Sequence, residues 1–373
     1  MPLIFYILFY FLFCLVIDVH TPAIRLALFP MIWGVVKMKP KVEAYLEKSN
    51  VLKVTKILMA ISIVLGIART FQVHYKLTKK LKHVEDIALL NRDAVETLFD
   101  KGKNPYKEII NTYNVKMKGG TIKNYGGYKY PPLQIFYYAP FVKIWNLRGI
   151  HVGNLIIYLA FVLSIFLFFE TQAAKYLGLI FFLGTDYFFT LAFNNGTNDF
   201  LPTLFLFWFV IALKKSHRFA WIMHGFSLLS KQLPGALMVF FFPSSKKEFK
   251  GVFLSLIFAT IGCLPFLAWD FTSFFENTVE FAMTRPVRES SLFWSLPHWT
   301  HKLITPFILI CALITRKFRF NIQKNHGFDL YVICLLMIFL VPAKMSPTHY
   351  FVWLTPFLIS FFCDLKLSTK EKF

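Results

Sequence analysis

An unusual concentration of acids lies in the stretch EDIALLNRDAVETLFDKGKNPY, which holds five of the 20 acidic residues of the chain. Asp86, Asp93 and Asp100 are spaced seven residues apart, which places them on one face of a helix. Apolar residues between them form a second face, so the stretch predicts an amphipathic helix that ends near Gly102. The acids are either ordinary solvated groups or bases that can accept a proton from a reacting hydroxyl.

Further polar residues interrupt the apolar runs of the chain. Asn198 and Asp199 lie in NNGTND, and Lys231 and Gln232 lie in SKQLPG. An ionisable side chain at membrane depth is costly unless it is paired, so function is the first hypothesis for Lys231 and Asp199. Two structural alternatives stay open: Asp199 caps the helix that follows it, or Lys231 extends its ammonium to the membrane surface.

Four more residues complete the candidate set. Arg285 and Arg288 lie in TRPVRES, and His349 and Tyr350 lie in SPTHY. The two arginines are either phosphate contacts or anchors to lipid head groups. His349 is either a ligand contact or a structural residue at the start of the last apolar run.

The composition indicates how these residues are positioned. The chain has 373 residues, of which 56% are hydrophobic and only 16% charged. Apolar runs close to the roughly 20 residues needed to cross a bilayer recur along it, which predicts an all-α polytopic membrane protein with about 10–12 transmembrane helices in a single domain, 1–373. The net charge of +21 comes from lysines and arginines in short loops, which are expected in the cytoplasm. Membrane lipids are therefore the expected partners, and nucleic acid is not.

Alternation of the runs predicts the topology. The segment 71–130, with its amphipathic helix, and the segment 269–301 are expected to be large external loops of this cell-membrane protein. The run 218–243 is expected to enter and return with SKQLPG at its turn. The alternation of cytoplasmic and external loops requires that one of four consecutive apolar runs does not cross the membrane, and we expect that run to be 174–193. Those four are 131–147, 152–169, 174–193 and 199–213.

The order of several motifs resembles the GT-C glycosyltransferases, in particular their mannosyltransferase-like branch, which uses polyprenyl-phosphate sugars. These motifs are DIALLNRDAVETLFDKGKNPY, YKYPPLQIFYYAPF, GTNDFLPTLF, LLSKQLPGAL, PFLAWDFTSFF and SPTHYFVWLTPFL, which together extend over most of the chain. The resemblance implies a catalytic acid in the first external loop, and it matches Asp86. Asp93, two turns further on, is the alternative.

The chemistry implied by this resemblance is inverting transfer of a hexose, such as mannose, from a polyprenyl-phosphate donor to a lipid-linked or cell-surface glycan acceptor. Asp86 deprotonates the acceptor hydroxyl. Lys231, Arg285, Arg288 and His349 contact the phosphate, where charge develops. Gln232, Tyr350, Asn198 and Asp199 complete the expected binding site.

The sequence makes no cofactor certain, because the acids show no spacing typical of a metal site, and a divalent metal stays compatible with the reaction. A transporter or flippase of lipid-linked sugars is the main alternative, because broken helices and charges within the membrane also suit transport. A non-catalytic membrane scaffold is a third hypothesis, but it leaves the external charges unexplained.

Overall fold

The computed structural model describes residues 2–18, 22–46, 49–78, 86–110, 113–117, 120–124, 126–185, 196–215, 219–232, 245–281, 291, 293, 296–319, 322, 327–343 and 348–363. Eleven of its α-helices form a bundle: α1 (Pro2–Asp18), α2 (Leu28–Leu46), α3 (Ser49–Thr78), α6 (Leu147–Phe168), α7 (Gln172–Gly184), α9 (Phe200–Lys214), α10 (Ala220–Ser230), α12 (Lys246–Trp269), α15 (Ile304–Lys317), α17 (Phe328–Leu340) and α18 (Thr355–Cys363). Short 3-10 segments accompany them: η1 (Pro22–Ala27), η4 (His298–Leu303) and η5 (Thr348–Trp353).

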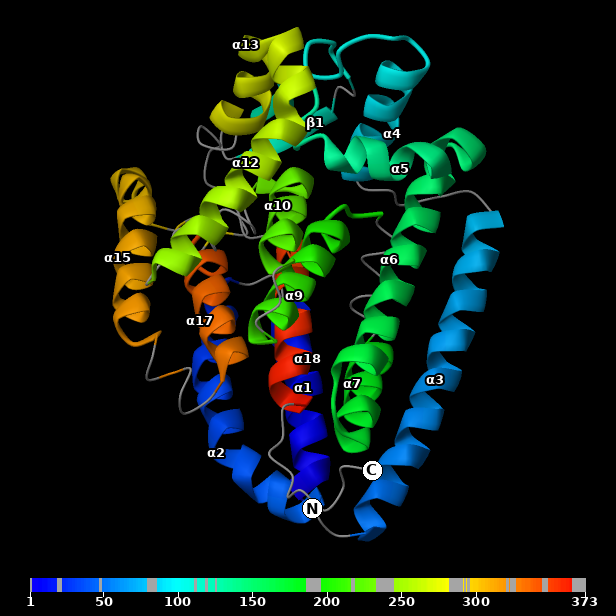
Figure 1. Ribbon diagram of the computed structural model, residues 1–373, viewed down its shortest axis with the longest axis vertical. Coiled ribbons are helices and arrows are strands. Elements are labelled where there is room, and N and C mark those ends of the chain that lie inside the picture. The colour runs from blue at the N-terminus through cyan, green and yellow to red at the C-terminus, as the bar shows by residue number, and fades with distance from the viewer. Residues whose placement is uncertain are drawn as a thin grey trace.

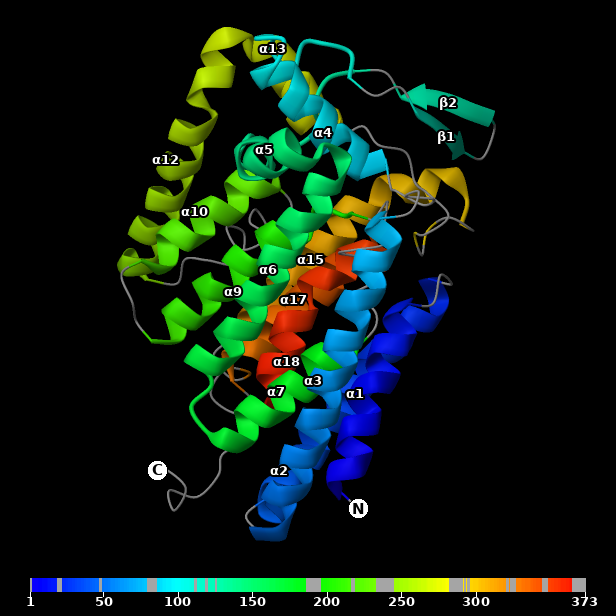
Figure 2. The ribbon, with the colours of Figure 1, turned by 90° about the vertical axis from the view of Figure 1, so that its right-hand side faces the viewer.

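One end of the bundle carries the remaining elements (Figure 1). They are α4 (Asp86–Phe99), the hairpin β1 (Tyr113–Met117) and β2 (Gly120–Asn124), α5 (Leu133–Trp145), α13 (Phe271–Phe275) and the π-helical turn η3 (Glu276–Glu280). The two segments predicted to be external loops therefore meet at the same end of the molecule, which Figure 2 shows from a second direction.

Helix α4 matches the amphipathic prediction. Its buried residues are Ile87, Ala88, Leu90, Asn91, Ala94, Val95 and Thr97, and it packs on α5 and α6. It ends at Phe99, and Gly102 beyond it adopts a φ of +62°, which an L side chain rarely tolerates. The periodicity of the sequence is therefore sufficient to locate this helix.

Two hydrophobic cores hold the structure together. The larger one runs through the bundle and is rich in aromatic contacts, as where Tyr10 stacks on Phe181 with ring centroids 4.3 Å apart. The smaller one lies at the end that carries α4, and it joins α4 and α5 to the beginning of α6 and the end of α12. The second core fixes the end segments on the bundle, since it is built from both.

The outer surface of the bundle is apolar, as expected for helices in contact with lipid. Helices α6 and α12 are long and apolar enough to cross a membrane, and α12 buries only 22% of its most apolar window within the protein. Shorter apolar helices in the described part of the chain add to these two. Helix α15 exposes apolar side chains around its surface, namely Phe307, Leu309, Ile310, Leu313 and Ile314.

The structure identifies a second run that does not lie along the bundle. Helix α5, within the run 131–147, lies across the end of the bundle rather than along it (Figures 1 and 2). It has 13 residues, or about 20 Å, which is short of the roughly 30 Å of a bilayer core. Helix α7, which begins the run 174–193 expected to be the exception, also has 13 residues and packs on α3, so that expectation stays a prediction. Residues 186–195, at the end of that run, lie outside the described residues.

The hairpin is a second departure from the sequence prediction. Its two strands pair in antiparallel register, with Tyr113 opposite Asn124 and Met117 opposite Gly120. The chain is therefore predominantly, but not entirely, helical.

Candidate active site

A buried ion pair lies where α10 ends. Lys231 follows the last residue of α10 in an extended conformation, and its Nζ lies 2.6 Å from Oδ1 of Asp199. The exposed fractions of the two side chains are 2% and 0%. The sequence predicted both residues as functional because unpaired charges are costly in a membrane, and the structure places them together.

Asp199 does not cap α9 through its side chain, so that structural alternative is wrong. The indole Nε1 of Trp353 donates a hydrogen bond of 2.9 Å to the same oxygen that binds Lys231. The carboxylate is therefore held by a cation and an indole, from α10 and η5 respectively. These two contacts fix the position of the Lys231 side chain relative to Asp199 and Trp353.

Aromatic rings surround the ammonium of Lys231. Its Nζ lies 4.9 Å from the ring centroids of both Tyr130 and Tyr350, and 5.7 Å from that of Trp353. These distances lie within the roughly 6 Å at which a ring face attracts a cation. Tyr350 stacks on Trp353 with centroids 4.8 Å apart, so the structure brings this predicted site residue next to Lys231. This makes Lys231 the centre of a partly aromatic cage.

Two glutamines connect the segments around the cage. The Nε2 of Gln134, in α5, donates to the carbonyls of Asn198 at 3.1 Å and Ser230 at 2.8 Å. The Nε2 of Gln232 donates to the carbonyls of Thr278 at 2.7 Å and Lys129 at 3.3 Å. The chain on both sides of Lys231 is therefore attached to α5, to η3 and to the loop before α5.

Three amide atoms at this place have no hydrogen-bond partner within the described part of the chain. They are Nδ2 of Asn198 and Oε1 of Gln134 and Gln232. Burying a polar atom without a partner costs about 1–3 kcal/mol. One donor and two acceptors are thus available for a ligand that carries hydroxyl or phosphate oxygens.

Lys129 is a second buried cation, which lies in the motif YKYPPLQIFYYAPF but to which the sequence analysis assigned no role. Its Nζ donates to Oδ1 of Asn277 at 2.5 Å and lies 4.4 Å from the ring centroid of Phe281. Asn277 in turn donates to the carbonyl of Tyr106 at 2.9 Å. The KYPP motif contains Lys129, and its position before α5 was the available signal.

Helix α4 approaches the ion pair through its first turn. A Cβ at Gly196 would lie 3.0 Å from Cβ of Ala88, so the α4 residues next to Asp86 touch the segment that leads to Asp199. Asp93 lies about 10 Å further along the helix. Its Oδ1 accepts a hydrogen bond of 2.7 Å from Nε of Arg92. Asp86 and Asp93 therefore differ in their position along the helix relative to the ion pair.

One tyrosine joins α4 to the loop before α5, and a second joins that loop to the segment that follows α4. The hydroxyl of Tyr128 donates to Oδ1 of Asn91 at 2.6 Å, and the hydroxyl of Tyr106 donates to the carbonyl of Tyr130 at 2.8 Å. Burial raises the pKa of both tyrosines well above the ordinary value of 10.0. They therefore act as neutral donors and not as bases at physiological pH.

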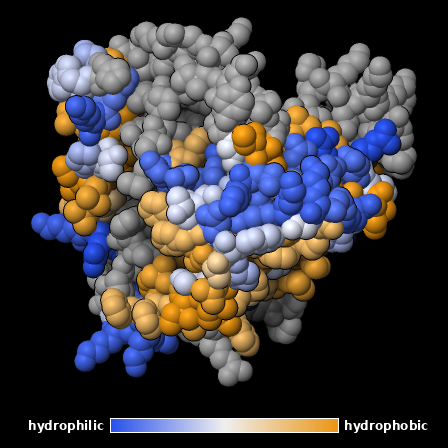
Figure 3. Space-filling model, turned by 90° about the horizontal axis from the view of Figure 1, so that it is seen from above, coloured by the Kyte–Doolittle hydropathy of each residue, from blue (hydrophilic) through white to orange (hydrophobic). Residues whose placement is uncertain are grey.

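The structure leaves the other candidates untested. Arg285 and Arg288 lie outside the described residues, and His349 belongs to η5, but its side chain is not described. No group of three or more His, Cys, Asp or Glu within the described ranges could hold a metal ion. Seen from above, the end of the molecule that carries α4 has a hydrophilic band bordered by hydrophobic surface (Figure 3).

The structure is similar to two crystal structures of ArnT from Cupriavidus metallidurans, one in the apo state and one bound to undecaprenyl phosphate. The TM-scores are 0.52 and 0.53, at sequence identities of 14% and 13%. The similarity covers 82% and 84% of this chain but 60% of each ArnT chain, so the chain spans about three-fifths of the length of these neighbours. No family model and no curated protein matches the sequence. The likeness confirms the predicted fold, a largely helical polytopic membrane fold.

Proposed function

We propose that this protein is a membrane glycosyltransferase whose donor is a sugar linked to a polyprenyl phosphate. The observation that carries the proposal is the buried, aromatic-lined ammonium of Lys231, paired with Asp199 beside α4. It occurs in a fold shared with ArnT, a protein that binds undecaprenyl phosphate. The ordered motifs of the sequence support the same class.

The proposed reaction is a single displacement at the anomeric carbon. Asp86 accepts the proton of the acceptor hydroxyl while the acceptor oxygen forms a bond to that carbon. The bond from the carbon to the phosphate oxygen breaks, and polyprenyl phosphate leaves with both electrons. The products are an inverted glycoside, protonated Asp86 and the lipid phosphate. One feature favours Asp86 over Asp93: the first turn of α4, which holds Asp86, contacts the segment that leads to Asp199.

Positive charge near the leaving phosphate stabilises the transition state. Lys231, whose ammonium is fixed by Asp199, supplies a hydrogen-bond donor, and Lys129, attached to Gln232 through its carbonyl, supplies positive charge from the adjoining loop. Arg285, Arg288 and His349 stay proposed phosphate contacts from the sequence. The free amide atoms of Asn198, Gln134 and Gln232 are proposed to bind sugar hydroxyls. A hexose such as mannose, a lipid-linked or cell-surface glycan as acceptor, and a site on the external face complete the proposal.

The test of the class is a donor-cleavage assay. Purified protein in vesicles receives a polyprenyl-phosphate hexose labelled in the sugar and, separately, in the phosphate. Transfer predicts that free lipid phosphate and labelled glycoside appear together. Movement of the intact donor across the bilayer without cleavage would instead identify a transporter, and neither activity with a panel of hexose donors would contradict both proposals.

A further inference from the structure

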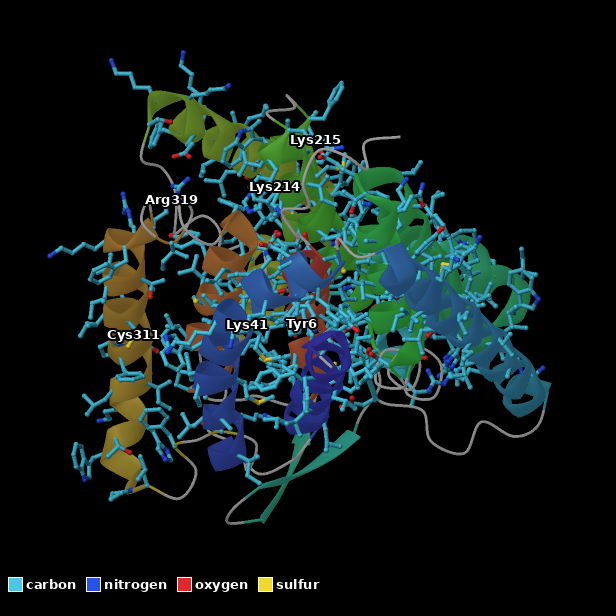
Figure 4. The ribbon with its side chains drawn as sticks, turned by 90° about the horizontal axis from the view of Figure 1, so that it is seen from below. Tyr6, Lys41, Lys214, Lys215, Cys311 and Arg319 are labelled. Atoms are coloured by element: carbon cyan, nitrogen blue, oxygen red, sulfur yellow. The ribbon has the colours of Figure 1, made fainter. Side chains whose placement is uncertain are left out.

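A separate polar pocket lies where α6 turns into α7, beside the ends of α9 and α18. It has a volume of about 250 Å³, and its lining includes Phe168, Glu170, Thr171, Lys214, Lys215 and Ser360. None of these residues belongs to the candidate active site. The volume lies below the roughly 300–1,000 Å³ of sites for drug-sized molecules, which suits a small polar group. Figure 4 shows Lys214 and Lys215 next to each other on the face seen from below.

One of the two lysines is already neutralised. Lys214 forms an ion pair with the buried carboxylate of Asp329 in α17. The hydroxyl of Ser360 donates to the same carboxylate at 2.8 Å. Because a buried charge separated from its partner is strongly destabilising, this pair stays intact when a ligand binds. Lys214 therefore contributes shape and hydrogen bonding to the pocket more than net charge.

Lys215 and Glu170 are the charges that remain available. The ammonium of Lys215 lies 5.5 Å from the ring centroid of Phe168, and its side chain is exposed. Glu170 is also exposed and has no ion pair with any described residue. The pocket thus offers one cation and one anion to a ligand. A singly charged anion would leave Glu170 unmatched beside it, whereas a zwitterion matches both.

The surface that leads to the pocket is apolar. The last two turns of α6 expose Leu163, Phe166 and Leu167, and α6 is one of the two helices in the described part of the chain that are long and apolar enough to cross a membrane. The pocket therefore lies at the end of a lipid-facing surface, where head groups are found. A ligand with a zwitterionic head and hydrocarbon tails matches the pocket and this surface together.

We propose that this pocket binds the head group of a phosphatidylethanolamine-type phospholipid. The phosphodiester contacts Lys215, the primary ammonium donates to Glu170, and the acyl chains lie along the exposed residues of α6. The proposal is independent of glycosyl transfer, since none of these residues takes part in the proposed reaction.

The test is lipid binding by the full-length purified protein in detergent, measured by native mass spectrometry. Phosphatidylethanolamine, phosphatidylcholine and phosphatidylglycerol with identical acyl chains are titrated separately. We expect phosphatidylethanolamine to bind about fivefold more tightly than phosphatidylglycerol, the order of effect of one charge near a membrane surface. Phosphatidylcholine should also bind more weakly, because its quaternary ammonium cannot donate a hydrogen bond to Glu170. Soluble glycerophosphoethanolamine, which lacks acyl chains, should compete only weakly.

Three variants separate the contributions. Glu170→Gln should remove the advantage of phosphatidylethanolamine over phosphatidylglycerol, and Lys215→Gln should weaken binding of all three lipids. Lys247→Gln, an exposed lysine outside the pocket, should change nothing. Equal binding of the three lipids to the wild-type protein would overturn the proposal, as would an unchanged preference in Glu170→Gln. Strong competition by the soluble head group would show a phosphate-ester site that does not recognise a membrane lipid.

Discussion

The ammonium of Lys231 and the carboxylate of Asp199 lie 2.6 Å apart, and protein atoms cover both almost completely. Trp353 donates to the same carboxylate oxygen, so residues from three distant parts of the chain meet at one atom. Because both charges are removed from water, either one alone would be a buried charge without an opposite charge beside it, which is strongly destabilising.

Removing one member of this pair should destabilise the protein more than removing both. Lys231→Met is expected to lower the free energy of unfolding by about 3–5 kcal/mol, because Asp199 stays buried and unpaired. The double variant Lys231→Met, Asp199→Leu should recover most of that loss but should not transfer sugar. Thermal unfolding in detergent and the donor-cleavage assay measure the two properties. A double variant with normal transfer would show that Lys231 is only structural.

The indole hydrogen bond should have a measurable effect of its own. Trp353→Phe retains an aromatic ring beside Tyr350 but removes the donor to Asp199, which should cost about 1.5–3 kcal/mol for a bond to a charged group. Trp33→Phe is the matched control, because Trp33 is 61% exposed and should change stability by less than about 0.5 kcal/mol. Equal effects of the two substitutions would contradict a role for the indole.

The choice of base predicts a difference between two acids of one helix. Asp86→Asn should lower the turnover of donor by about 10²-fold or more while the melting temperature stays unchanged. Asp93→Asn should retain turnover within a few-fold, because Asp93 lies about 10 Å further along α4 from the segment that leads to Asp199. Kinetics with labelled donor decide the matter. If Asp93→Asn loses activity and Asp86→Asn does not, the assignment is reversed, and full activity of both variants excludes both acids.

The close approach of α4 to the site predicts an effect at Gly196. Gly196→Ala places a Cβ 3.0 Å from Ala88 and 3.2 Å from a ring carbon of His151, at a φ of +67°. Gly102→Ala is the matched control, because Gly102 has a φ of +62° but no atom within 4 Å of its added Cβ. Both should lose about 1–2 kcal/mol to backbone strain. Only Gly196→Ala should lose more and slow transfer, and equal losses would show that the contact is loose.

Asp270 predicts a dependence of stability on pH. A hydrogen bond from the backbone N–H of Ser273 lowers the pKa of its carboxyl, and Lys107 lies 3.5 Å away. A carboxyl whose pKa is lower in the folded than in the unfolded protein stabilises the fold at pH values above its unfolded pKa. That stabilisation is lost as the pH falls through the pKa of the folded state. Asp270→Ala should therefore lower the melting temperature at pH 7, and the difference should shrink in acid.

Asp270→Asn separates the charge from the hydrogen bond in that experiment. Asn retains an oxygen for the N–H of Ser273 but loses the charge that faces Lys107. Its melting temperature should lie between those of the wild type and Asp270→Ala at pH 7. A deficit of Asp270→Ala that stays constant from neutral to acidic pH would show that the charge contributes nothing.

Local patterns and burial costs account for what could be predicted from the sequence. The spacing of apolar residues located α4, and the cost of charge in a membrane selected Lys231 and Asp199. The contacts that join these residues to others were not predictable, because the partners are far apart in the chain. Trp353 is 154 residues from Asp199, and Gln134 is 96 residues from Ser230. The periodicity of a local stretch of sequence does not predict a contact between residues so far apart.

Helix α5 and the hairpin show the same limit in another form. An apolar run is equally hydrophobic along the bundle and across its end, so composition could not set the orientation of α5. The packing of α5 on α4 sets this orientation, and the second core is formed by that packing. For the hairpin, the Gly119-Gly120 pair was the available turn signal, but five-residue strands are too short to stand out against the helical pattern.

The hydrogen bonds of Gln232 set how Lys231 can behave. One amide group attaches the residue after Lys231 to Thr278 and to Lys129, and the backbone N–H of Lys231 itself donates to Ser227. Lys231 is therefore a stationary charge whose freedom was lost during folding, and not a flexible arm that closes on a substrate. A negatively charged group that reaches it loses little additional entropy to ordering of the protein. Any displacement of the η3 segment is also passed to the ammonium through a single residue, so the two sides of the site must move together.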